Sequence, residues 1–118
     1  MRCLIVDDSA QFSTSASAIL QSGGIAVVGV ASNSGDALDR YRELRPDVTL
    51  VDVDLGAESG FDVVRALHDI GAPASRMILI STHAESDFAD LISDSPVSGF
   101  LPKFGFSTQA VRALVGDI

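Results

Sequence analysis

Five short apolar runs alternate with five segments of helical periodicity, and this alternation leaves few folds open to the chain. The apolar runs cover residues 3–6, 25–31, 48–55, 77–80 and 97–101, and the helical segments cover 12–20, 34–44, 61–67, 85–93 and 107–115. A strand that is followed by a helix and a further strand joins a parallel sheet by a crossover over one of its faces. We therefore predict an α/β protein in which a parallel five-stranded sheet carries helices on both faces, as a single domain over residues 1–118.

The third apolar run carries the most informative polar residue, Asp52. Val48, Leu50, Val51 and the residues that alternate with them lack the polar face of a surface strand, so we expect a strand that is buried on both faces. A carboxylate at the end of such a strand is costly unless it has a partner. Open α/β sheets place their ligand sites at this carboxyl edge. We interpret Asp52 as a nucleophile.

Other strand ends carry groups that would complement Asp52. Asp7 and Asp8 follow the first strand, Ser81 follows the fourth, and Lys103 comes shortly after the fifth. In a parallel sheet these positions lie along one edge. The sequence therefore predicts three carboxylates, a hydroxyl and an ammonium group around one site.

This combination of side chains suits phosphoryl transfer. Clustered carboxylates raise one another's pKa unless a cation is present, and Mg²⁺ (or Mn²⁺) takes oxygen ligands of this kind. Lys103 and the metal would neutralise the oxygens of a transferred phosphoryl group, and Ser81 would donate a hydrogen bond. The expected product is an acyl phosphate on Asp52.

Each residue also has a simpler structural explanation. Asp7 or Asp8 can serve as the N-cap of the first helix, and Ser81 can bond to the backbone at a strand end. Ser59 and Asp62 have the spacing of a capping box. Phe100 by itself suits a core position.

The composition excludes some classes of protein. The chain has 118 residues, a formal net charge of −8 and 47% hydrophobic residues. These values suit one folded domain and argue against direct nucleic acid binding, which needs clustered Lys and Arg. The lone cysteine, Cys3, is expected to be a buried apolar residue. With no signal-peptide pattern and no apolar run long enough to cross a bilayer, we expect a soluble cytoplasmic protein without membrane contact.

Taken together, these motifs closely match one family over almost the whole chain. The matching residues, in order, are Asp7, Asp8, Asp52, Gly60, Ser81 and the run Gly99-Phe100-Leu101-Pro102-Lys103. The chain resembles the receiver domain of two-component response regulators, of the chemotaxis-receiver type. The resemblance implies a doubly wound, flavodoxin-like three-layer sandwich with strand order 2-1-3-4-5.

The resemblance also implies a role for each residue. Asp52 would be the phosphoacceptor and, with Asp8, a direct Mg²⁺ ligand; Asp7 would act through water, and the backbone carbonyl of Asp54 would be a further ligand. Ser81 and Lys103 would hold the phosphoryl oxygens. Phe100 would be the switch aromatic, turning inward as the Ser81 hydroxyl moves to the phosphate.

The implied partners are proteins. A histidine kinase or phosphotransfer protein would phosphorylate Asp52, and a downstream target would bind the surface of the fourth helix, fifth strand and fifth helix. Phosphorylation would shift a pre-existing equilibrium of that surface. The family also allows a phosphorylation-dependent homodimer.

Four positions depart from the commonest family pattern. Gly56 and Phe104 stand where prolines are frequent, so the first loop is expected to be more mobile and a cis bond after Lys103 is not expected. Thr82 is bulkier than the usual residue beside the acceptor. Asp54 adds a further carboxylate two residues after the acceptor, Asp52. With His83 on the rim of the site, Thr82 and Asp54 are candidate modulators of a competent receiver.

Two other functions remain open at this point. Asp52-Val53-Asp54 has the Asp-x-Asp form of haloacid dehalogenase phosphatases, in which the second Asp is a general acid, although that motif belongs on the first strand of its fold. The other alternative is a protein-binding receiver that cannot be phosphorylated. Apart from its own phosphorylation and dephosphorylation, we expect no enzymatic activity.

Overall fold

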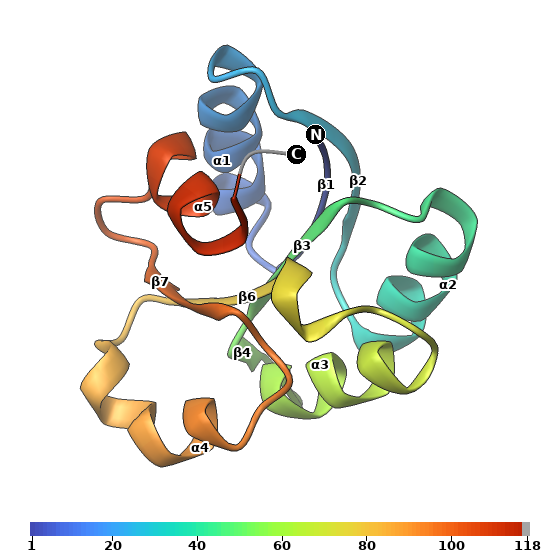
Figure 1. The fold of residues 1–118 in the computed structure, drawn as a ribbon, viewed down its shortest axis with the longest axis vertical. Helices are drawn as coiled ribbons and strands as arrows, with labels where there is room; N and C mark the ends of the chain where they lie inside the picture. The colour runs from blue at the N-terminus through green and yellow to red at the C-terminus, as the bar shows by residue number, and fades with distance from the viewer. Residues whose placement is uncertain (117–118) are drawn as a thin grey trace.

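The computed structural model describes residues 1–116, and a five-stranded parallel sheet lies at its centre (Figure 1). The strands are β1 (Arg2–Val6), β2 (Ala26–Ala31), β3 (Val48–Asp52), β6 (Met77–Ser81) and β7 (Gly99–Pro102). Their spatial order is β2-β1-β3-β6-β7, and all neighbouring pairs are parallel. This is the predicted order 2-1-3-4-5 of a flavodoxin-like fold.

Helices cover both faces of the sheet and complete three layers (Figure 1). They are α1 (Ala10–Ser22), α2 (Ser34–Leu44), α3 (Gly60–Asp69), α4 (Ala89–Ser93) and α5 (Thr108–Val115), with the short 3₁₀ segments η1 (Ala74–Arg76) and η2 (Glu85–Phe88). In the described part of the chain, no helix is long and apolar enough to span a membrane.

Alternating residues of the central strands build two cores, one on each face. Along β1, Cys3 and Ile5 belong to the core beneath α1 and α5, while Leu4 and Val6 belong to the core beneath α2 and α3. Because successive side chains of a strand point to opposite faces, a strand between two helical layers must be apolar throughout. This is why the central strands lack a polar alternation.

The helix starts confirm some predictions and correct others. Ser107, at which the last predicted helical segment begins, is the N-cap of α5. Ser9, not Asp7 or Asp8, is the N-cap of α1, although Asp7 Oδ1 accepts a hydrogen bond from the Ser9 N–H over 2.8 Å. Ser59 caps α3 by accepting from Phe61 N–H, one residue earlier than the capping-box geometry predicted.

Two predicted elements are divided in the structure. The third strand was expected to run over 48–55, but β3 ends at Asp52, and the chain then forms a hairpin of β4 (Asp54–Leu55) and β5 (Glu58–Ser59). Gly56 has φ +71, which a tight turn of this kind requires at its first central residue. The helix expected over 85–93 divides at Phe88, whose φ of −128 and ψ of 18 are not helical.

Candidate functional site

The carboxyl ends of four parallel strands meet at one edge of the sheet. β3 and β6 end at Asp52 and Ser81, and the residues after β1 and β7 are Asp7-Asp8 and, directly after Pro102, Lys103. Asp7, Asp52 and Ser81 are buried, Lys103 is half-buried and Asp8 is exposed. The structure thus brings together the five side chains that the strand ends predicted.

The three aspartates form a cluster that can hold a cation. Asp7, Asp8 and Asp52 each offer a carboxylate oxygen, and these oxygens lie within 4.8 Å of one another. Asp7 Oδ2 is buried and receives no hydrogen bond of normal geometry. Like charges at this distance repel unless a cation compensates them, and Mg²⁺ binds through one or two carboxylates together with water. The donor set therefore fits a hard divalent cation.

Lys103 lies between two of these carboxylates. Its Nζ is 2.6 Å from Asp7 Oδ2 and 3.3 Å from Asp52 Oδ2. The same Nζ lies 4.5 Å from the centroid of the Phe12 ring, a distance at which a cation is attracted to the ring face. Phe12 is the first residue of the helical segment predicted over 12–20, and nothing in the spacing of that segment shows that it would lie beside Lys103.

Burial and the neighbouring charges give Asp52 an unusual acidity. The pKa of Asp52 is raised from 3.8 to about 6, first by burial and then by the negative charge of Asp7. Lys103 lowers that pKa, as does the backbone N–H of Asp54, which donates to Asp52 Oδ1 over 3.3 Å. Asp52 is therefore ionised at neutral pH, as a nucleophile must be, and becomes protonated in mild acid.

Ser81 is oriented by the segment that follows it. Its Oγ accepts a hydrogen bond from the backbone N–H of His83 over 3.0 Å and lies 3.5 Å from His83 Nδ1. The simpler structural explanation, bonding to the backbone, therefore holds for Ser81. The hydroxyl proton of Ser81 is not used by this bond, so it can be donated to His83 Nδ1 or to another acceptor.

A row of rings extends from His83 into the core. The His83 and Phe88 rings meet edge to face at 5.9 Å, and Phe88 lies 5.7 Å from Phe61 and 6.5 Å from Phe100. Phe100 is 5% exposed, so the predicted switch aromatic is inside the protein in this structure. Phe88, which falls in the helical segment predicted over 85–93, contacts both His83 and Phe100 and so links them.

The β4–β5 hairpin borders the acidic cluster. A Cβ on Gly56 would lie 3.5 Å from Asp8 Oδ2, and a Cβ on Gly60 would lie only 2.0 Å from the Asp52 carbonyl oxygen. The hairpin is tied to α2 by Glu58, whose carboxylate accepts hydrogen bonds from the Ser34 N–H (3.0 Å) and the Ser34 hydroxyl. These bonds lower the pKa of Glu58, and sequence reasoning gave no sign of this contact.

The candidate modulators lie on the outer side of the site. The side chains of Asp54, Thr82 and His83 are all exposed. The peptide bond after Lys103 is trans, as expected, since no peptide bond in residues 1–116 is cis.

The second histidine, His68, lies on α3 and takes no part in the site. Its Nδ1 lies 2.8 Å from the Ala72 carbonyl oxygen.

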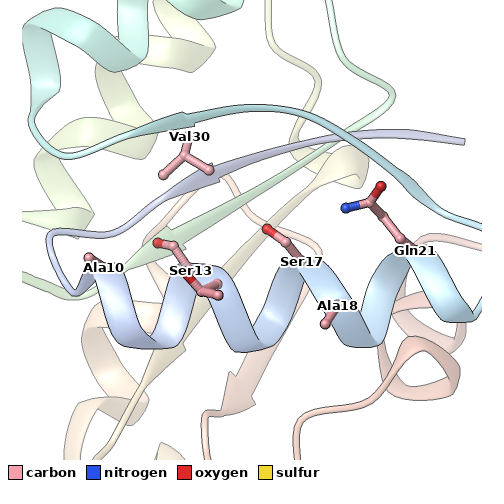
Figure 2. Close-up of a pocket in the computed structure, with 7 residues that line it drawn as sticks. Ala10, Ser13, Ser17, Ala18, Gln21 and Val30 are labelled. Atoms are coloured by element: carbon pink, nitrogen blue, oxygen red, sulfur yellow. The ribbon is translucent and has the colours of Figure 1, made fainter.

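A pocket between α1 and the edge strand β2 differs from the acidic cluster in the chemistry of its lining (Figure 2). It has a volume of about 540 Å³ and is lined by small or uncharged side chains, among them Ser13, Ser17, Gln21 and Val30. Ser13 Oγ is buried without a hydrogen-bond partner. Since none of its lining side chains is a base, an acid or a metal-binding carboxylate, the chemistry of this chain belongs to the edge that carries Asp52.

Fold and site together define a class of protein: a doubly wound sheet with three aspartates and a lysine at the carboxyl edge of its strands. The family model of the response regulator receiver domain matches residues 3–115. The chain therefore belongs to the response regulator receiver domain family.

Individual relatives agree with this assignment. The chemotaxis protein CheY from Thermotoga maritima is 32% identical over 113 residues, which cover 96% of this chain and 93% of that protein. A protein-glutamate methylesterase/protein-glutamine glutaminase from Idiomarina loihiensis is 31% identical over 104 residues, which cover 87% of this chain but only 27% of that protein.

A solved structure shows the same architecture. The crystal structure of a LuxR-family two-component response regulator from Aurantimonas sp. SI85-9A1 superposes with a TM-score of 0.83 at 27% identity, covering 97% of this chain and 84% of that one.

Proposed function

We propose that Asp52 accepts a phosphoryl group from a histidine kinase or phosphotransfer protein. We also propose that the chain is a single receiver domain that acts as a phosphorylation-dependent switch. The observation that carries the proposal is the buried Asp52 carboxylate, with Lys103 Nζ at 3.3 Å and two further carboxylates beside it. This arrangement offers a nucleophile, a fixed positive charge and a cation site at one point.

In the proposed step, an Asp52 carboxylate oxygen attacks the phosphorus of a phosphohistidine. A P–O bond forms, the P–N bond breaks, and its electron pair stays with the imidazole nitrogen of the donor. Lys103 is close enough to Asp52 to meet the negative oxygens of the incoming group, and the Ser81 hydroxyl can donate a hydrogen bond to one of them. Asp54 N–H, which bonds to Asp52 Oδ1, orients the nucleophile.

Mg²⁺ or Mn²⁺ would be held by Asp8 and Asp52 directly, with Asp7 acting through water and the Asp54 carbonyl as a further ligand. Such a cation supplies charge neutralisation for the phosphoryl oxygens. Because Lys103 pairs with Asp7 at 2.6 Å, Asp7 would also hold the lysine in place.

The switch would pass from Ser81 to the α4-β7-α5 surface. When Ser81 donates to a phosphoryl oxygen, its contacts with His83 change, and Phe88 and Phe100 lie next in the row of rings. A downstream protein or a second copy of the chain would recognise the altered surface. Thr82, His83 and Asp54 border the approach to Asp52 and would set the lifetime of the phosphorylated state. We place this function in the cytoplasm.

Phosphorylation by a small donor tests the proposal. Acetyl phosphate with Mg²⁺ should add one phosphoryl group to the wild-type protein, detected by intact mass, while Asp52→Asn should add none. Lys103→Met should label much more slowly, and Asp39→Asn, an exposed acidic residue on α2, should label as the wild type does. Equal labelling of Asp52→Asn would overturn the site, and no labelling of the wild type would favour a binding-only receiver.

Turnover of simple phosphate esters separates the remaining alternative. A haloacid dehalogenase phosphatase would use Asp54 as a general acid, but the Asp54 side chain is exposed here, and Asp52 ends the third strand along the chain rather than the first. With the receiver family assigned, we expect no turnover. The chain spans about a quarter of the length of the methylesterase relatives, and we propose no esterase activity for it.

A further inference from the structure

A cleft with an apolar floor and an acidic rim lies between the β4–β5 hairpin and the η2–α4 segment, which both contribute residues to its lining. Its volume is about 610 Å³. Phe61 and Phe88 form part of its floor, and Leu91, which is 47% exposed, stands on its edge. We call it the hairpin–α4 cleft. None of the residues that line it lies on β7 or α5, so the cleft is distinct from the α4-β7-α5 surface.

Three of the five polar residues that line the cleft are acidic. Asp54, Glu58 and Asp87 contribute carboxylates, and its lining includes no Lys or Arg. Glu85 and Asp90, which neighbour the lining residues Asp87, Phe88 and Leu91 in the sequence, are also acidic and add to this field. A cleft lined with charge of one sign concentrates the potential and favours ligands of the opposite sign.

We infer that the hairpin–α4 cleft is a docking site for a basic amphipathic segment of a partner protein, with an aromatic or aliphatic side chain in the apolar floor and Lys or Arg on the acidic rim. The volume suits one or two anchoring side chains rather than a whole helix. An apolar anchor surrounded by complementary charges is a recurring form of peptide recognition. The net charge of −8 over the chain points to the same class of partner.

The cleft is connected to the phosphorylation site through its own wall. His83 and Phe88 both line it, their rings meet at 5.9 Å, and the His83 N–H donates to Ser81 Oγ over 3.0 Å. A phosphoryl group that takes the Ser81 hydroxyl would alter the position of His83 and hence the shape of the cleft. This regulation rests on the proposed function, whereas the binding itself does not.

Binding is tested with a fluorescein-labelled helical peptide of lysine, leucine and one central phenylalanine, followed by fluorescence anisotropy on the full chain. A twin peptide with glutamate in place of each lysine should not bind, and a twin with alanine in place of phenylalanine should bind about fivefold or more weakly, as expected for the loss of a buried anchor. Binding should weaken as salt is added.

Two matched pairs of variants locate the site. Asp87→Asn keeps an oxygen that can accept from the Ala84 N–H and removes one rim charge, so it should weaken binding about two- to fivefold. Asp94→Asn, outside the cleft on the same segment, should not. Leu91→Ala should weaken binding, while Ile19→Ala, which removes a side chain of similar exposure from α1, should not. Amide chemical shifts should move at Ala57, Phe88 and Leu91.

The inference is overturned if the glutamate twin binds as well as the lysine peptide, if Asp87→Asn and Asp94→Asn behave alike, or if the shifts lie on α5 instead. All of these are measured on unphosphorylated protein, so they decide the binding site whether or not Asp52 can be labelled. The regulation is tested on protein whose phosphoryl group is confirmed by intact mass. If phosphorylated and unphosphorylated protein bind the lysine peptide equally well, the proposed regulation of the cleft is refuted, but the binding site is not. A failure of labelling refutes the proposed function alone.

Discussion

Replacing Asp52 by asparagine should make the metal-free protein more stable at neutral pH, although it removes the proposed reactive group. Folding buries this carboxylate beside Asp7, and Lys103 offsets only part of the cost, as the pKa near 6 shows. Asparagine has the shape of the protonated acid and carries no charge. The substitution therefore removes the cost of holding an ionised carboxylate in the folded state.

The size of the gain follows from the raised pKa. Between 3.8 and about 6 the difference is about two pKa units, and each unit corresponds to about 1.4 kcal/mol, so the gain is at most about 3 kcal/mol. The folded protein holds the Asp52 proton more tightly than the unfolded chain does. The wild type therefore loses stability as the pH rises from about 4 to about 6, while the asparagine variant lacks this loss. The gain should be small near pH 4 and complete above about pH 7.

Urea unfolding measures this directly. The chain has no tryptophan, so the transition is followed by far-ultraviolet circular dichroism, in EDTA and over a pH series. Asp39→Asn is the control: Asp39 is exposed and only 4.0 Å from Arg42, so its loss should change stability by less than about 0.5 kcal/mol at any pH. A variant that is no more stable than the wild type at neutral pH, or equally stabilised at both ends of the series, would refute the reasoning.

Four further outcomes are expected. Gly60→Ala should destabilise the fold by more than about 2 kcal/mol in urea unfolding, because its Cβ would lie 2.0 Å from a backbone carbonyl oxygen. Ser34→Ala should raise the pKa of Glu58 toward 4.5 in a carboxyl ¹³C NMR titration; the wild-type bonds favour the ionised Glu58, so the stability they add is present above that pH and is lost as the pH falls. Burial raises the pKa of Cys3 to about 12, so a thiol reagent should modify it only after unfolding, and rapid modification of the native protein would contradict its burial. Mg²⁺ should raise the melting temperature of the wild type, EDTA should reverse the effect, and Asp8→Asn should show neither.

The sheet and the residues that form the site could be predicted, because both depend on the local pattern of apolar and polar residues along the sequence. A strand between two helical layers is buried on both faces and is therefore mainly apolar, and β1, β3 and β6 have this character in the sequence itself. The polar residue that ends such a strand lies at the carboxyl edge by topology alone. Asp52 and Ser81 were identified in this way, before any distance was known.

Local pattern was less reliable where the chain leaves the regular elements. The third strand was predicted three residues too long, because Val53 and Leu55 are as apolar as the strand before them. In the structure they belong to the α3 side of the core, while residues 54–55 pair with 58–59 in the hairpin. Apolar character shows that a residue is buried, but not which partner it is buried against.

The sequence by itself determined the kind of protein and the chemical groups at its site: a doubly wound sheet with carboxylates, a hydroxyl and a lysine after its strands. Only the tertiary structure decided how these groups pair. Lys103 lies closer to Asp7 than to Asp52 and rests against Phe12, and Phe88 joins His83 to the core. These contacts join residues far apart in the chain, and small differences in packing decide which neighbour is closer. No periodicity or spacing in a single sequence records that choice.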